Sequence, residues 1–280
     1  MSILKASMGN AVRRKWKFAL AVFVFGVALV VLTNVYDVAG VADRMATMSE
    51  EVGSGATPPS EEEVGTIVRS GGLLFLFGTL ALFFAFGSIL FAFLMPGGMV
   101  ANERGSTAIM LWAQHPMPLT SFYMRRYLGV QAVTLAAMLV FGLVAAAAVL
   151  PAQAASTTRA GDALGICLEG MLACAVSFAI SAHGIRRAAF FGVVYYLASG
   201  VSMEVLPLAE QSTSAIAVLA RGVLPFLLFP VNAIAEAVGG FESGVAWDWG
   251  ATGMVFYHFA LWTAVAWLGL RRIEGRPLKL

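Results

Sequence analysis

Six long apolar runs constrain this chain more than any other feature of its sequence. Each is close to 20 residues long and holds at most one carboxyl group, which suits a helix that crosses the hydrocarbon core of a bilayer. Only 12% of all residues are charged, against about 25% in soluble domains. The sequence therefore predicts an all-α polytopic membrane protein, with residues 1–280 forming a single transmembrane domain. The predicted spans are Phe18–Tyr36, Gly71–Met95, Gly129–Leu150, Ala163–Ala182, Ala188–Leu208 and Trp249–Leu270.

The positions of the basic residues predict the orientation. Six spans place both termini on one side, and that side receives fourteen of the 18 Lys and Arg residues. Because cytoplasmic loops carry an excess of Lys and Arg, both termini are expected in the cytoplasm. The expected location of the chain is the inner (cytoplasmic) membrane of the cell. Residues 1–17 place Leu4, Met8, Val12 and Trp16 at four-residue spacing among basic residues, which predicts an interfacial helix. The alternative is a plain positively charged flank of the first span.

Two segments are expected on the outer side. Residues 37–70 form an acidic loop, in which Ser60 followed by three glutamates predicts a helix start. Residues 209–248 contain Gly222–Ala235, which is apolar but too short to span and is interrupted by two prolines. Such runs are typical of re-entrant segments, so we expect an outer hairpin before the sixth span. A seventh span is the alternative, but it would move the basic C-terminal tail outside. On size alone, the outer region is also where an extracytoplasmic partner protein would bind.

Polar groups within the spans are few. Glu169, Glu204 and His258 form a possible intramembrane polar site, because an ionisable group inside a membrane is costly unless it is paired or hydrated. The alternative for each is a hydrogen-bonded packing role. Cys167 and Cys174 lie seven residues apart, roughly 10 Å along a helix, which predicts free thiols. The sequence holds no catalytic motif, nucleotide-binding loop or metal-site spacing, so we expect neither an enzyme nor a cofactor on this chain.

The stretch Met99–Leu128 between the second and third spans differs from both its neighbours. It carries charged and polar residues, a Pro-x-Pro at Pro116 and Pro118, and an apolar group at Met110–Trp112. A buried helix would not hold the charged residues and the prolines, and a disordered linker would not hold the apolar group. We therefore expect a short helical element on the cytoplasmic side that docks onto a partner.

Three groups of residues in this stretch resemble the corresponding loop in permease subunits of type-2 ABC exporters. They are Glu103-Arg104-Gly105-Ser106-Thr107, Trp112-Ala113-Gln114-His115-Pro116, and Ser121 with Arg125-Arg126. The sequence departs from the family pattern where Ser106 replaces a common glycine, where His115 precedes the proline, and where arginine replaces a lysine. The resemblance covers about 30 residues as sequence. The six spans, the basic N-terminal helix, the outer loop and the hairpin agree with the family as a layout.

The resemblance implies a non-catalytic subunit that forms the translocation path of an ATP-driven exporter. Residues 99–127 would be the cytoplasmic coupling segment, resting in a cleft of a separate ATPase subunit that binds ATP and Mg. Two such ATPase copies and a second permease copy, as a homodimer, would complete the transporter, with no nucleic acid involved. The implied docking residues are Glu103, Arg104, Gly105, Ser106, Thr107, Met110, Leu111, Trp112, His115 and Pro116. A secondary transporter, and a membrane enzyme or scaffold acting on lipid, remain the alternatives, and the substrate stays open.

Overall fold

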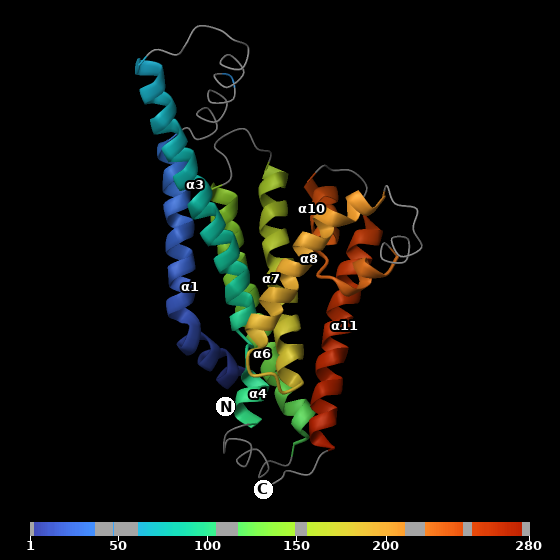
Figure 1. Ribbon diagram of the computed structural model, residues 1–280. Coiled ribbons are helices and arrows are strands. Elements are labelled where there is room, and N and C mark those ends of the chain that lie inside the picture. The colour runs from blue at the N-terminus through green and yellow to red at the C-terminus, as the bar shows by residue number, and fades with distance from the viewer. Residues whose placement is uncertain are drawn as a thin grey trace.

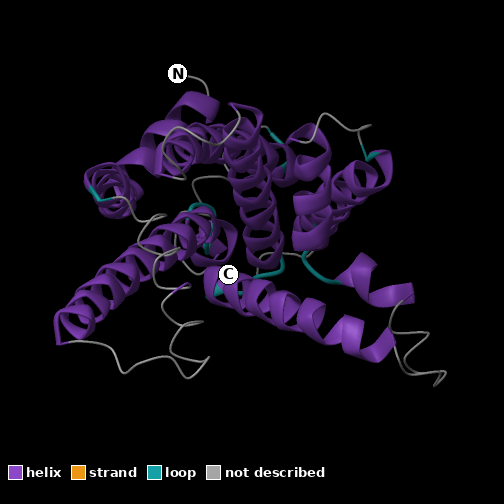
Figure 2. Cartoon of the chain, turned by 90° about the horizontal axis from the view of Figure 1, so that it is seen from above, coloured by secondary structure: helices purple, strands orange, loops and turns teal. Residues whose placement is uncertain are grey.

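The computed structural model describes residues 3–36, 47, 61–104, 117–148, 156–210, 222–242 and 248–275. These residues are helical apart from short turns, and no strand occurs among them (Figures 1 and 2). The helices are α1 (Ile3–Val35), α3 (Glu61–Leu94), α4 (Met99–Arg104), α6 (Leu119–Ala148), α7 (Ser156–Ala182), α8 (Ala188–Glu210), α10 (Val231–Glu242) and α11 (Trp249–Glu274).

Five stretches of this described part are long and apolar enough to cross a membrane: Lys5–Val35, Val68–Arg104, Leu119–Ala148, Ala163–Ala182 and Trp249–Glu274. The prediction of an all-α, multi-pass membrane protein is therefore confirmed. The expected fifth span corresponds to α8, in which the stretch Ala188–Gly200 is a shorter apolar helix. That all six cross, and in which direction, stays a prediction.

Helix α7 lies at the centre of the bundle and packs against α3, α6, α8, α10 and α11 (Figure 1). Every residue from Leu172 to Ala179 is almost completely buried, as expected for a helix that is apolar on all sides. Small residues allow this close packing. A Cβ atom on Gly142 of α6 would lie 2.8 Å from the Cα of Ala163, and one on Gly269 of α11 would lie 3.1 Å from the Ala182 carbonyl. The backbones of α6 and α11 thus approach opposite ends of α7.

Helix α1 packs against α3 and α6 and is continuous from Ile3 to Val35. The predicted interfacial helix and first span therefore form one helix, whose first turns angle toward α4 (Figure 1). A Cβ on Gly26 would lie 2.5 Å from the Phe84 ring of α3, so this glycine sets the distance between the two helices. Large apolar side chains on the outer faces of α1, α3 and α11 are exposed, as suits surfaces that face lipid.

The segment expected to form a hairpin has a helix–break–helix shape. Residues 222–227 are helical, the helix breaks at Leu228–Pro230, and α10 follows. Three side chains of neighbouring helices hold the break: Tyr195 donates to the Leu227 carbonyl (2.7 Å), Ser199 Oγ accepts from the Phe229 amide (2.9 Å), and His258 Nε2 lies 3.1 Å from the Pro225 carbonyl. Whether the hairpin enters a membrane stays a prediction. Most of the acidic loop lies outside the described residues, and α3 begins at Glu61, directly after Ser60.

Candidate functional site

One end of the bundle gathers the first turns of α1, α4, the start of α6, the α7–α8 turn and the end of α11 (Figure 1). We call it the basic end, because Lys and Arg side chains occur on each of these elements. It includes the described part of the predicted coupling segment, residues 99–104 and 117–127. Of the predicted docking residues, only Glu103 and Arg104 are described. The others, Gly105, Ser106, Thr107, Met110, Leu111, Trp112, His115 and Pro116, lie outside the described residues.

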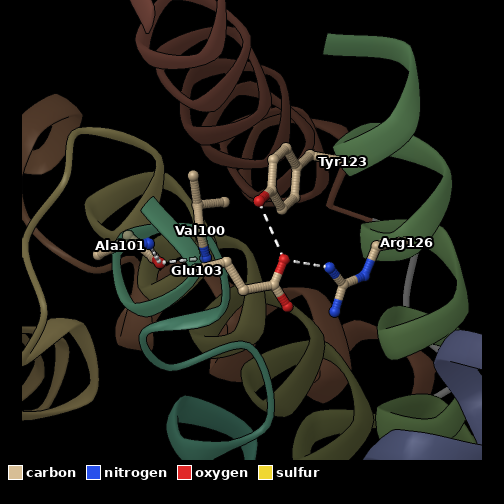
Figure 3. Close-up of polar contacts among 6 residues, drawn as sticks. Val100, Ala101, Glu103, Tyr123 and Arg126 are labelled. Atoms are coloured by element: carbon tan, nitrogen blue, oxygen red, sulfur yellow. Dashed lines mark hydrogen bonds and ion pairs between the residues drawn. The ribbon is translucent and has the colours of Figure 1, made fainter. Parts of the chain in front are cut away.

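Helix α4 is fixed to the central helix by its first turn. The Ser181 hydroxyl of α7 accepts hydrogen bonds from the amides of Val100 (3.1 Å) and Ala101 (3.3 Å) (Figure 3). The first amides of a helix have no partner within it, so a side-chain oxygen supplied by another helix does the work of an N-cap. Val100 is fully buried against the core. The short helix is thus anchored to α7.

The chain reaches α4 through a tight turn at Met95–Gly98. Gly98 has a φ of 75°, in the left-handed region that favours glycine. A Cβ atom there would also lie 2.4 Å from the side-chain amide nitrogen of Asn102 and 3.1 Å from the Arg186 carbonyl. Both the conformation and the space require glycine. This turn redirects the chain from the end of α3 into α4.

The carboxylate of Glu103 joins α4 to α6. It accepts a hydrogen bond from the Tyr123 hydroxyl (2.9 Å) and forms an ion pair with Arg126 (Figure 3). The Arg126 guanidinium also lies 5.5 Å from the centre of the Phe122 ring. The Arg126 side chain is only 14% exposed and that of Glu103 is 28% exposed, so water screens the pair only in part. Glu103, expected to meet a charge on a partner, is thus already engaged within the chain.

Helix α11 completes the connection between the helices at the basic end. The carboxylate of Glu274 accepts hydrogen bonds from the Leu119 amide (3.1 Å) and the Thr120 hydroxyl (2.7 Å) at the start of α6. His183 Nε2, just after α7, lies 3.1 Å from the Val265 carbonyl of α11. Neither Ser181 nor Glu274 was predicted from the sequence. For Glu274, the one signal in the sequence is an acid that follows two arginines in an otherwise basic tail.

Arg104 faces a different environment from Glu103. It is exposed and lines a cavity of about 280 Å³, together with His183 and Arg272. No carboxylate lines this cavity within the described residues. In this cavity Arg104 thus shares the lining with a second arginine and with no acid of the described residues.

Glu169 and His258, the two intramembrane candidates whose side chains are described, have different partners. Glu169 is half-buried, hydrogen-bonds to Tyr196, and lines a mainly apolar cavity of about 390 Å³ beside α3. His258 is fully buried and contacts the hairpin at Pro225, which is a packing role. Glu204 lies within α8, but its side chain is not described.

Cys167 and Cys174 are free and buried, as predicted. Among the residues described, no His, Cys, Asp or Glu cluster could hold a metal ion.

The fold defines a multi-pass, all-helical membrane protein with a polar network at its basic end. Comparison with family models, with curated proteins and with solved structures gives no match.

Proposed function

We propose that this chain is the membrane-spanning subunit of a type-2 ABC exporter, which forms the translocation path and is driven by a separate ATPase. The observation that supports this proposal best is the fixation of α4. Ser181 anchors it to α7, and Glu103 joins it to α6, whose first turn is capped by α11. A push on residues 105–116, which lie between α4 and α6, would therefore reach three long helices instead of being absorbed by a loose loop.

In the proposed assembly the chain lies in the cytoplasmic membrane, and its basic end faces the cytoplasm. Helix α8 is then a sixth span. Two ATPase copies bind there, and ATP and Mg bind to them. The coupling helix would begin at α4 and continue toward Pro116. A second copy of this chain completes the path across the membrane. The exposed apolar face of α11, including Phe256 and Trp267, supports an interface with lipid or with that second copy.

Purification of the tagged chain from its native membrane in mild detergent tests the proposal. We expect an ATPase subunit to copurify. We expect Arg104→Glu to release it, because Arg104 is exposed and no carboxylate of the described residues lines its cavity. Arg187→Glu is the matched control, since Arg187 is also exposed and lies on the α7–α8 turn of the same end. A wild-type chain that purifies without any ATPase would refute the proposal.

Glu103 requires a different design, because it is engaged within the chain. Glu103→Arg alone would disturb α4 whatever its role in docking. The double exchange Glu103→Arg with Arg126→Glu restores an internal ion pair with reversed polarity. If the copurified ATPase returns in the double variant, Glu103 acts by positioning α4. If it stays absent, Glu103 also meets the partner.

A secondary transporter is the second possibility, and the cavity beside Glu169 is the observation that favours it. In that case transport would depend on a proton gradient and not on ATP. Glu169→Gln would abolish that dependence, while an ATPase-driven exporter would keep its ATP requirement in the same variant. Transport into inverted vesicles, energised by either source, separates the two functions.

A further inference from the structure

Two adjoining hollows lie between α1 and α6 at the basic end. The first is polar and has a volume of about 190 Å³. Among the described residues, Arg14 and Lys15 of α1 and Arg126 of α6 provide its positive charges, and Glu103 provides the one carboxylate. Its remaining polar lining comes from Ser7, Asn10 and Asn102.

The second hollow is an apolar groove of about 470 Å³ that continues from the first. Ala11, Lys15 and Met95 line both hollows, so the two are connected. Along the groove, the lining from α1 is Val12, Trp16, Ala19, Leu20 and Phe23, and that from α6 is Val133, Ala136, Ala137, Val140 and Phe141. A positively charged pocket thus opens directly onto an apolar channel between two helices.

We infer that the two hollows form one binding site for an anionic phospholipid of the leaflet at the basic end. The phosphate of the lipid occupies the polar hollow, and one acyl chain lies in the groove. The charges favour an anion. Arg126 is balanced by Glu103, whereas Arg14 and Lys15 form no ion pair with a carboxylate among the described residues. Two basic side chains therefore remain for the phosphate and for a charged headgroup.

The dimensions also suit a lipid. Lys15, at the junction of the hollows, lies eight residues before Phe23, near the far end of the groove. At 1.5 Å per residue this is roughly 12 Å along the helix, close to the depth of one leaflet in a hydrocarbon core of about 30 Å. Lys15 is half-buried, as expected of a side chain whose stem packs on apolar surface while its amine reaches a headgroup. A soluble anion would use the polar hollow alone and would leave the groove without a ligand.

The test is competitive lipid binding to the purified full-length chain in nanodiscs. Nanodiscs contain phosphatidylcholine with or without phosphatidylglycerol, and native mass spectrometry counts the lipids that the released protein retains. We expect the wild-type chain to retain phosphatidylglycerol preferentially. Removal of both charges in Arg14→Ala with Lys15→Ala should reduce that retention by roughly tenfold or more.

The matched control removes two charges from the same helix without touching the hollows. Arg13 and Lys17 are exposed neighbours that line neither one. In the variant Arg13→Ala with Lys17→Ala we expect retention within about twofold of wild type. An equal loss in both double variants would overturn the inference, because it would show a diffuse attraction of basic residues to an anionic surface. Equal retention of phosphatidylcholine and phosphatidylglycerol by the wild-type chain would also overturn it.

The groove is tested separately by filling it. Ala136 is an exposed residue of α6 that lines only the apolar hollow, so Ala136→Phe should lower retention of long-chain phosphatidylglycerol with little effect on the core. Circular dichroism and monodisperse elution confirm that each variant is folded. Inorganic phosphate serves as a second competitor. If it displaces the lipid at equal concentration, or if Ala136→Phe has no effect, the site binds a soluble anion and the lipid assignment is wrong.

Discussion

The ion pair between Glu103 and Arg126 makes a measurable prediction about how firmly α4 is held. A double-mutant cycle with Glu103→Gln and Arg126→Leu isolates their interaction, because each single variant removes the pair and the double variant removes both partners. Exposed pairs contribute about 0.2–1 kcal/mol, and breaking a fully buried pair costs about 3–5 kcal/mol. The exposures of 14% for Arg126 and 28% for Glu103 lie between these limits. We therefore expect a coupling energy of about 1–2 kcal/mol.

The assay is unfolding of the purified chain by SDS in mild detergent, followed by far-ultraviolet circular dichroism. Tyr123→Phe is a useful companion variant, because it removes one hydrogen bond to Glu103 and leaves the ion pair in place. We expect it to lower the free energy of unfolding by about 1 kcal/mol. The same cycle with Arg187 in place of Arg126 is the control, since Arg187 forms no ion pair with Glu103. A coupling energy no larger than that of the control would refute the view that this pair holds α4 on α6.

Five further variants, at four positions, test the packing in the same titration. Gly142→Leu should lower the free energy of unfolding by about 1–3 kcal/mol, because even a Cβ atom there would overlap the α7 backbone. Gly78 has open space around it, so Gly78→Ala should raise the free energy of unfolding by up to about 1 kcal/mol. Glu274→Ala should cost about 1–2 kcal/mol and speed hydrogen exchange in the first turn of α6, which it caps. His258→Leu should cost about 0.5–2 kcal/mol and His258→Gln less, because glutamine can still donate to the hairpin carbonyl.

The sequence predicted the helices well because the signals that define them are local. Apolar runs of membrane-spanning length, and the prolines at positions 225 and 230, determine the conformation of the residues beside them. They can therefore be interpreted without knowledge of the fold. The burial of Cys167 and Cys174 could be predicted for the same reason. The interfacial helix and the first span were predicted as separate elements, and α1 joins them in one continuous helix, because nothing between Lys17 and Phe18 ends a helix.

The polar network at the basic end could not be predicted in this way. Ser181 and Val100 are 81 residues apart in sequence, and Glu274 and Leu119 are 155 apart. No periodicity relates such residues, and a serine within an apolar helix or a single acid in a basic tail has many ordinary explanations. For Glu103 the sequence suggested a partner outside the chain, because a charged residue in a docking stretch is expected to meet a charge on another protein. In the structure its carboxylate is instead bound by Tyr123 and Arg126 of the same chain.

The difference between Glu103 and Arg104 bears on how a docking element on this chain would work. A partner that pushes on residues 105–116 needs a fixed support on this chain and a free contact for itself. In the proposed exporter, Glu103 would provide the support, since its carboxylate is held by two side chains of α6. Arg104 would provide the contact, since it is exposed beside a cavity with no carboxylate among the residues described. Adjacent residues on a short helix point in different directions, so one can face the bundle while the other faces a partner. The double exchange Glu103→Arg with Arg126→Glu keeps an internal ion pair and should preserve the stability of the bundle. Neutralising Arg104 should weaken binding of the partner without that loss of stability. The two variants together would separate the stability of the bundle from binding of the partner.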